Sequence, residues 1–338
     1  MTYSLHALSV SAGRLGLAVL LACSSISAQS LTPSHPGFKA PVPTRYSVTA
    51  EEKDILSHMN VVYLDDGRGG TVKTLRIEGI NVQVVNGQGT SDTTNGLGNL
   101  IVGYNELGNP NGDDRTGSHN IVTGQKNSFS SYGGLVAGLT NTASGPWSSV
   151  SGGRNNEASG PFSSVSGGQG NWASGISSSV SGGHSNTASG YASSVSGGLF
   201  NTASGSRSSV SGGFDNTASG NFSSVSGGSG NTAYGTSSSV SGGRSNEASG
   251  SRSSVSGGKN NEASDDYSSV SGGGYNTASG GSSSVSGGIV NTASGNWSSV
   301  SGGRNNTASG LNSSVSGGGD RSALGAYNWA AGSLSENN

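Results

Sequence analysis

Apolar residues recur along most of this chain at a fixed spacing, with small polar residues between them. A valine returns every fifteen residues from Val150 to Val315, and an alanine runs in step with it from Ala158 to Ala323. The consensus unit reads x-x-Ser-Ser-Val-Ser-Gly-Gly-x-x-Asn-Thr-Ala-Ser-Gly. Such a period indicates a repeat architecture in which each unit stacks only on its neighbours. It argues against a flexible Gly/Ser linker, because a disordered chain has no reason to keep Val, Ala and Asn in register.

Each unit contains two short extended pieces, Ser-Ser-Val-Ser and Asn-Thr-Ala-Ser, and each is followed by glycine. Side chains alternate between the faces of a strand, so Val and Ala share one face while their Ser and Thr neighbours take the other. Glycine supplies the positive φ that tight corners demand. The sequence therefore predicts an all-β fold, a parallel β-roll or β-solenoid of 15-residue coils. The expected core residues are Val150, Val165, Val180, Val195, Val210, Val225, Val240, Val255, Val270, Val285, Val300, Val315, Ala158, Ala173, Ala188 and Ala203.

Asparagine recurs at the second corner of the coil. Stacked side-chain amides there are expected to hydrogen-bond between coils and to satisfy buried backbone groups. We assign this ladder a structural role rather than a ligand-binding one. Its first members are Asn156, Asn171, Asn186, Asn201 and Asn216.

The apolar interior of one coil is thin. Burying one Val and one Ala contributes about 3 kcal/mol per coil. Ordering fifteen residues costs on the order of 20 kcal/mol before hydrogen bonds are counted. The single cysteine, Cys23, lies in the expected leader, so a disulfide does not offset this cost. Because the ordering cost exceeds the gain from apolar burial, we predict that the Val/Ala face packs against another chain, most simply in a homotrimer.

The chain start is typical of a secretory signal peptide over residues 1–28. Arg14 precedes the apolar run 15–22, and cleavage is expected near Ala28, which predicts a secreted or cell-surface protein. Lipidation at Cys23, within Leu-Leu-Ala-Cys, is the alternative. Residues 29–46 are expected to form a Pro-rich linker. Residues 97–145 carry degenerate repeats, residues 146–332 carry the regular ones, and residues 333–338 form a polar tail. Its final Ser-Glu-Asn-Asn, residues 335–338, is expected to fray.

Residues 47–96 are expected to form an N-terminal cap for the solenoid, made of a short helix and a hairpin. Thr49 followed three residues later by Glu52 suits a capping box at the start of the helix. Residues 61–64 and 71–80 are predicted strands, joined through a turn that contains Asp65 and Asp66.

Most of the variation within the array falls at the two x-x corners of the coil. Aromatic residues and Arg, which are enriched at interaction surfaces, gather at the first corner. The alternative is that this corner tolerates any residue or fills gaps between chains. The second corner, with residues such as Arg154 and His184, is more polar and is expected to be solvated. The candidate binding residues are Trp147, Phe162, Tyr191, Arg207, Phe222, Arg252, Tyr267, Trp297 and Tyr327.

The sequence offers no basis for catalysis, so we expect no enzyme, no cofactor and no metal site. The five His residues are scattered, and no His/Cys cluster has metal-ligand spacing. No Gly-Lys-Ser/Thr phosphate loop occurs. A net charge of −2 with 10% charged residues provides no basic field for nucleic acid. No segment of the mature chain reaches the roughly 20 apolar residues that a transmembrane helix needs.

Ser-Val-Ser-Gly followed by Asn-Thr-Ala-Ser-Gly resembles the YadA-type head repeat of trimeric autotransporter adhesins. The earlier units are closer still, since Val122, Val136 and Val150 are fourteen residues apart, the spacing near which that family repeats. The resemblance covers about residues 97–332. It implies a left-handed parallel β-roll, three chains side by side on a bacterial surface, and binding of host or matrix molecules.

The chain also departs from that family. Its main period is fifteen, Ser replaces the second apolar residue of the unit, and no heptad stalk or membrane-anchoring strands precede Asn338. The resemblance is therefore to a head module alone, without the family's self-export and anchor.

The leading functional hypothesis is an exported structural or adhesive repeat protein that attaches to a host, matrix or glycan ligand through many weak corner contacts. One alternative is an ice-binding β-solenoid that uses Thr and Ser ladders. Another is a phage-fibre-like rod that binds carbohydrate. The Thr ladder comprises Thr187, Thr202, Thr217, Thr232, Thr277, Thr292 and Thr307, and it is interrupted by Glu157, Trp172, Glu247 and Glu262.

Overall fold

The computed structural model describes residues 48–332 and 334–336. The expected signal peptide and Pro-rich linker, residues 1–46, lie outside the described residues. The chain divides into two compact units, residues 1–81 and 82–338, and each is considered by itself. The division falls before the predicted cap boundary at residue 96, so residues 82–96 belong with the coils.

The first unit contains a short helix and a hairpin, as the sequence predicts. Helix α1 (Ala50–Ser57) begins with a capping box: the Thr49 hydroxyl accepts from the Glu52 N–H at 3.1 Å, and the Glu52 carboxylate accepts from the Thr49 N–H at 2.7 Å. Strands β1 (Met59–Asp65) and β2 (Thr71–Ile77) pair antiparallel. In the turn, the Asp66 carboxylate accepts from the backbone N–H of Gly70 at 2.9 Å.

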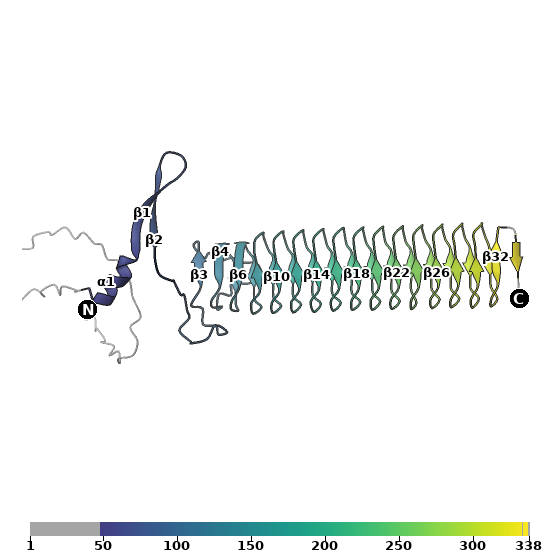
Figure 1. Ribbon diagram of the computed structural model, residues 1–338, viewed down its shortest axis with the longest axis horizontal. Coiled ribbons are helices and arrows are strands. Elements are labelled where there is room, and N and C mark those ends of the chain that lie inside the picture. Colours follow the sequence, from purple (N-terminus) through teal and green to yellow (C-terminus); the bar gives the residue numbers. More distant parts are fainter. Residues whose placement is uncertain (1–47, 333, 337–338) are drawn as a thin grey trace, which may run out of the picture. The chain divides into compact units, whose positions relative to one another are not determined.

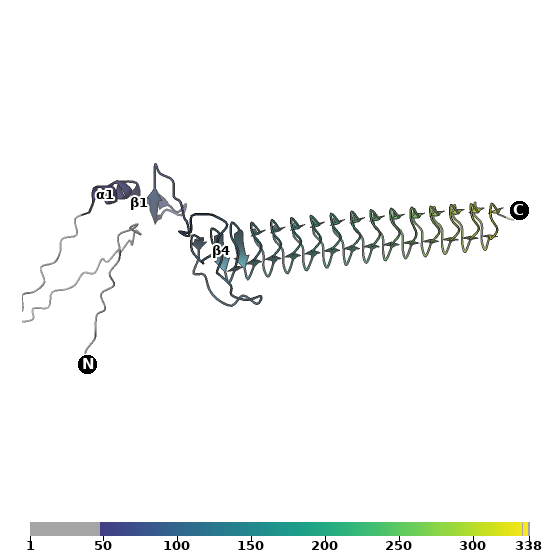
Figure 2. The same cartoon turned by 90° about the horizontal axis from the view of Figure 1, so that it is seen from below.

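The second unit is a parallel β-solenoid, which confirms the predicted fold class. Its coils stack one beside the next along a single axis (Figure 1), and the two rows of short strands run on different sides of the coils (Figure 2). We number the coil positions 1–15 from Pro146, so that Val150 is at position 5 and Ala158 at position 13. Positions 4 and 5 form one ladder and positions 12 and 13 the other, each residue pairing with its equivalent fifteen residues away.

The valine ladder begins with three longer strands of the degenerate repeats and continues with one strand per coil. Its members are β3 (Leu100–Val102), β4 (Ile121–Gln125), β6 (Leu135–Leu139), β8 (Ser149–Val150), β10 (Ser164–Val165), β12 (Ser179–Val180), β14 (Ser194–Val195), β16 (Ser209–Val210), β18 (Ser224–Val225), β20 (Ser239–Val240), β22 (Ser254–Val255), β24 (Ser269–Val270), β26 (Ser284–Val285), β28 (Ser299–Val300), β30 (Ser314–Val315), β32 (Trp329–Ala331) and β33 (Leu334–Glu336).

The alanine ladder is a 14-stranded sheet. Its members are β5 (Ser128–Phe129), β7 (Thr142–Ala143), β9 (Glu157–Ala158), β11 (Trp172–Ala173), β13 (Thr187–Ala188), β15 (Thr202–Ala203), β17 (Thr217–Ala218), β19 (Thr232–Ala233), β21 (Glu247–Ala248), β23 (Glu262–Ala263), β25 (Thr277–Ala278), β27 (Thr292–Ala293), β29 (Thr307–Ala308) and β31 (Ser322–Ala323). A third row of single-residue bridges links position 9 from coil to coil, as between Arg154 and Gln169.

The core closes inside one chain. Every position-5 Val from Val150 to Val315, and every position-13 Ala from Ala158 to Ala323, is at most 1% exposed. Serine at position 3 and asparagine at position 11 are buried beside them, as at Ser148 and Asn156. The prediction that the Val/Ala seam stays dry only against a second chain is therefore wrong. These small residues leave an interior so narrow that a single coil fills it.

The asparagine ladder lies where the sequence places it, and it hydrogen-bonds in three directions. The Asn156 side-chain oxygen, Oδ1, accepts from the Asn171 backbone N–H at 2.9 Å. The Asn156 amide nitrogen donates to the carbonyls of Gly152 in its own coil and Gly168 in the next, at 3.1 Å and 3.0 Å. The same pattern repeats through Asn306 and ends at Arg321, whose N–H donates to the Asn306 side chain. Each coil is thereby tied to its neighbours through its buried corner.

The last strand of the valine ladder runs in the opposite direction to the others. Strand β33 pairs antiparallel with β32, with Ala330 opposite Ser335. The prediction that residues 335–338 fray is therefore wrong for residues 335 and 336, whose backbone pairs with β32.

Candidate functional site

The candidate binding residues lie in one column at the first corner of the coil, on the solvent side. All but Tyr191 occupy position 2, and Tyr191 occupies position 1. Every position-2 residue from Trp147 to Tyr327 has a left-handed backbone, with φ between 51° and 63°. The position-2 column comprises Trp147, Phe162, Ser177, Ala192, Arg207, Phe222, Ser237, Arg252, Tyr267, Ser282, Trp297, Asn312 and Tyr327.

Position 10, at the second corner, has the same backbone conformation and provides an internal comparison. Left-handed backbone favours Gly, Asn and Asp and costs other residues about 1–3 kcal/mol each. Seven of the twelve position-10 residues are Gly, Asn or Asp, whereas only Asn312 is so at position 2, where eight of thirteen are aromatic or Arg. The first corner therefore carries large side chains where its backbone disfavours them. The position-10 column comprises Asn155, Gly170, Ser185, Phe200, Asp215, Gly230, Ser245, Asn260, Tyr275, Val290, Asn305 and Asp320.

Part of the position-2 column is engaged in contacts between adjacent coils. The rings of Trp147 and Phe162 stack with centroids 4.9 Å apart and planes 7° apart. The Arg207 guanidinium lies 5.4 Å from the Phe222 ring centroid and 5.8 Å from that of Tyr191. Such contacts are worth about 0.5–1.5 kcal/mol each and offset some of the backbone cost.

A similar pair occurs further along the column. The Arg252 guanidinium lies 5.2 Å from the Tyr267 ring centroid and donates a hydrogen bond to the Tyr267 hydroxyl. Trp297 and Tyr327 make no ring contact with any residue between 48 and 332. Contacts between coils therefore explain why some position-2 side chains are large, but they do not explain Trp297 and Tyr327.

The second corner is not simply polar and solvated, which corrects the prediction for it. Phe200 packs edge-on against both His184 and Phe214, with centroids 6.0 Å apart in each pair. The Lys259 ammonium lies 5.7 Å from the Tyr275 ring centroid. The sequence contained a sign of these contacts, because Phe200 and Tyr275 occupy a position where Gly, Asn and Asp predominate.

Hydroxyl groups form straight columns along the strands. Position 4 is Ser in every coil from Ser149 to Ser314, and position 6 is Ser from Ser151 to Ser316. These columns flank the buried valines and are partly or fully exposed. The Thr column at position 12 lies on the other ladder and is broken by Glu and Trp, as in β9 and β11. The unbroken serine columns are therefore more regular than the Thr ladder proposed for ice binding.

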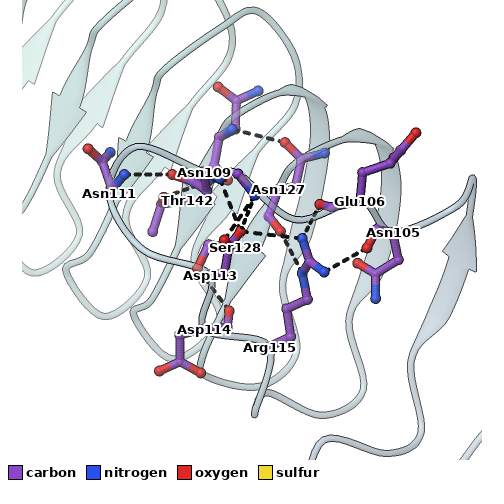
Figure 3. Close-up of polar contacts among 12 residues, drawn as sticks. Asn105, Glu106, Asn109, Asn111, Asp113, Asp114, Arg115, Asn127, Ser128 and Thr142 are labelled. Carbon is purple, nitrogen blue, oxygen red and sulfur yellow. Dashed lines mark hydrogen bonds and ion pairs between the residues drawn. The ribbon is translucent and has the colours of Figure 1, made fainter.

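The insertion at residues 104–116 forms a polar cluster over the first coils (Figure 3). The Asp113 carboxylate accepts from the Gly108 and Asn109 N–H groups at 2.9 Å and 3.0 Å, and it lies 3.5 Å from the Arg115 guanidinium. The Asn109 and Gly108 N–H groups, with the Arg115 charge, hold the pKa of Asp113 below its usual value. Asn109 is buried, and its amide donates to the Asn141 carbonyl at 3.1 Å.

The same insertion covers the first strand of the alanine ladder. The Asp114 carbonyl accepts from the Phe129 N–H and the Ser128 hydroxyl, both at 2.8 Å. Phe129 is 1% exposed at the start of the core, where later coils have Ala. The cluster hydrogen-bonds most of its polar groups internally, although Glu106 Oε2 is buried without a partner, and it closes one end of a sheet, which is a structural role.

Over the described part of the chain, no group of three or more His, Cys, Asp or Glu residues is placed to hold a metal ion. No helix among residues 48–332 is long and apolar enough to cross a membrane. No protein-family model matches this chain, and a search of curated proteins found no significant match. The resemblance to the YadA head repeat thus rests on the repeat motif itself.

Proposed function

We propose that this protein is an exported adhesive rod that attaches to surfaces through its position-2 column. The observation that carries the proposal is the contrast between the two corners. Both have left-handed backbone, yet only the first concentrates aromatic residues and Arg there. Exposed aromatic and Arg side chains are the types that dominate binding energy at interfaces.

A stiff solenoid suits this role because it repeats weak contacts at fixed intervals. Each position-2 side chain follows the previous one by one coil, about 4.8 Å along the ladder. Several contacts made at once to a repetitive or immobilised ligand gain from high effective concentration, so the whole binds far more tightly than any single corner.

Binding of the full chain to surfaces coated with gelatin, mucin or insoluble polysaccharide tests the proposal. The decisive variant changes the eight aromatic and Arg residues of the position-2 column to Ser, which already occupies that position at Ser177, Ser237 and Ser282. A matched control changes Phe200, Phe214 and Tyr275 at the second corner to Ser. We expect the first variant to lose attachment and the control to keep it, with circular dichroism unchanged. Attachment that survives the eightfold change contradicts the proposal.

We also propose that the chain forms a homotrimer, and that the hairpin rather than the coil is the reason. Pairing puts Val61 opposite Leu75 and Met59 opposite Ile77, so these side chains share one face of β1–β2. Val61 and Leu75 are each 57% exposed in the single chain. A two-stranded hairpin with an uncovered apolar face is marginal in water. Copies of the same hairpin would cover it, and the resemblance to trimeric adhesins favours three.

The molecular mass of the full chain in solution tests the trimer. Leu75→Asn should dissociate the assembly, whereas Arg76→Asn, on the opposite face of the same strand, should not. A wild-type chain that sedimented as a monomer at micromolar concentration would refute it.

A second candidate function, ice binding, is favoured by the unbroken serine columns at positions 4 and 6. Hydroxyl groups there repeat at about 4.8 Å between coils. Thermal hysteresis of the soluble protein would support this function if Ser224→Lys and Ser239→Lys abolished it. An unchanged freezing point would exclude it.

A further inference from the structure

The C-terminal part of the position-2 column has its own spacing. Tyr267, Trp297 and Tyr327 stand at every second coil, separated by Ser282 and Asn312. Neighbouring coils are about 4.8 Å apart, so successive rings start about 9.6 Å apart. Their side chains are 54%, 60% and 63% exposed. We call Tyr267, Trp297 and Tyr327 the aromatic ridge.

This spacing distinguishes the aromatic ridge from the start of the column. Trp147 and Phe162 lie one coil apart and stack on each other at 4.9 Å, so a ligand ring cannot enter between them. In the ridge, the small residues Ser282 and Asn312 separate the aromatic rings. Arg252 comes from the coil before Tyr267 and therefore leaves the Ser282 side of that ring uncovered.

The surroundings of the ridge are hydroxylic, and the charged side chains near it gather at its Tyr267 end. Ser269, Ser284 and Ser299 of the position-4 column lie two residues beyond the corner in successive coils. In the five coils that carry the ridge, the only charged side chain at positions 1, 2, 4 and 6 is Asp266, and it lies at the Tyr267 end together with Asp265 and Arg252. The coils of Trp297 and Tyr327 carry no charged side chain at these four positions. The surface therefore suits a neutral ligand that offers both apolar faces and hydrogen-bonding groups.

We propose that the aromatic ridge binds an extended β-linked polysaccharide lying along the solenoid; this rests on the proposed adhesive function and names its ligand. A pyranose ring has an apolar C–H face that stacks on an aromatic ring, and its rim hydroxyls pair with serine hydroxyls. In an extended β-linked chain, two sugar rings span about the length of two coils. Every second sugar then meets an aromatic side chain, and the match repeats along the ridge. A globular protein partner has no such repeat.

Depletion of the full chain from solution by insoluble cellulose and by chitin tests the inference, with insoluble starch as the control polymer. Starch is α-linked and coils, so it does not keep the spacing. The first variant is Tyr267→Ser with Trp297→Ser and Tyr327→Ser. The second combines Ser282→Trp with Trp297→Ser, which keeps the number of aromatics and breaks their two-coil spacing. The matched control is Phe200→Ser with Phe214→Ser and Tyr275→Ser.

We expect wild type and the matched control to bind cellulose or chitin and not starch. Both ridge variants should raise the half-saturating concentration about tenfold or more, because each loses simultaneous contacts. Circular dichroism should be the same for all, since Ser and aromatic residues already share this backbone position. Binding of neither polymer overturns the inference, as does equal binding by wild type and either ridge variant.

The outcome also separates this inference from the proposal on which it rests. Attachment to gelatin that is lost in the eightfold position-2 variant, without binding to cellulose or chitin, would leave the adhesive function standing. If the triple ridge variant also lost that attachment, the ridge would be assigned to an extended protein chain. A polyproline-II segment, with three residues per turn and about 9.3 Å per turn, has a comparable period. Absence of attachment to every surface would refute both.

Discussion

Removing one member of the asparagine ladder should weaken the solenoid at a defined place. In Asn231→Ala, the Asn231 amide no longer donates to the carbonyls of Gly227 and Gly243, at 2.8 Å and 3.0 Å. The Asn246 N–H loses its acceptor at 3.0 Å and is left unpaired in the interior. Two lost bonds at about 1 kcal/mol each, and a stranded buried donor at about 1–3 kcal/mol, give about 3–5 kcal/mol in total.

Urea unfolding followed by circular dichroism measures the total, and hydrogen exchange locates it. The Asn246 amide should exchange about a hundredfold faster or more, while amides several coils away should keep their protection because each coil contacts only its neighbours. Ser226→Ala, on the solvent side of the same coil, is the matched control and should be nearly neutral. A loss below about 1 kcal/mol in Asn231→Ala, or unchanged exchange at Asn246, would show that the ladder does not hold the coils together.

Three further perturbations have equally specific expectations. Gly243→Ala should lower the free energy of unfolding in urea by about 3 kcal/mol or more, because φ is +88° and the new Cβ would lie 2.2 Å from the next coil's carbonyl oxygen. The control is the adjacent Gly242→Ala, whose Cβ meets open space and should change the stability little. Val240→Ala should cost about 2–3 kcal/mol at a side chain that is 1% exposed, whereas Ser241→Ala should be neutral, and equal midpoints would contradict the core assignment. The N–H groups that bond the Asp113 carboxylate lower its pKa, so this carboxylate stabilises the loop above the ordinary carboxyl pKa. That stabilisation should be lost as the pH falls through the lowered pKa of Asp113. Hydrogen-exchange protection of residues 104–116 should follow this titration in wild type and not in Asp113→Asn.

The period, the strands and the asparagine ladder could be predicted from the sequence because each is a local consequence of the fifteen-residue unit. Alternation along Ser149–Val150 determines which side chain faces inward, and the recurrence of Asn156 determines where amides stack. The prediction that a second chain must cover the Val/Ala seam was wrong because only Val and Ala were counted as core residues. Buried Ser148 and Asn156 also fill the interior, so the narrow coil closes by itself.

Other features had weaker signals. The left-handed backbone at position 10 could be predicted from residues such as Asn155 and Gly170, which favour it. The same conformation at position 2 could not, because Trp147 and most of its equivalents are residue types that disfavour it. The role of the insertion at residues 104–116 could not be predicted, because it depends on contacts with Phe129 and Asn141 that no local pattern encodes. The aromatic ridge is defined by the alternation of coils with and without an aromatic residue at position 2. That alternation becomes apparent only when the position-2 residues are compared as one column.

Strand β33 bears on how the rod ends. A stack of identical parallel strands resembles the growing tip of a fibril, onto which a second molecule can add in the same sense. The reversed pairing of Ala330 with Ser335 presents an incoming chain with an antiparallel edge, so the parallel repeat of this ladder is not propagated. We expect the reversed strand to disfavour parallel addition of a second molecule to the valine ladder beyond β33.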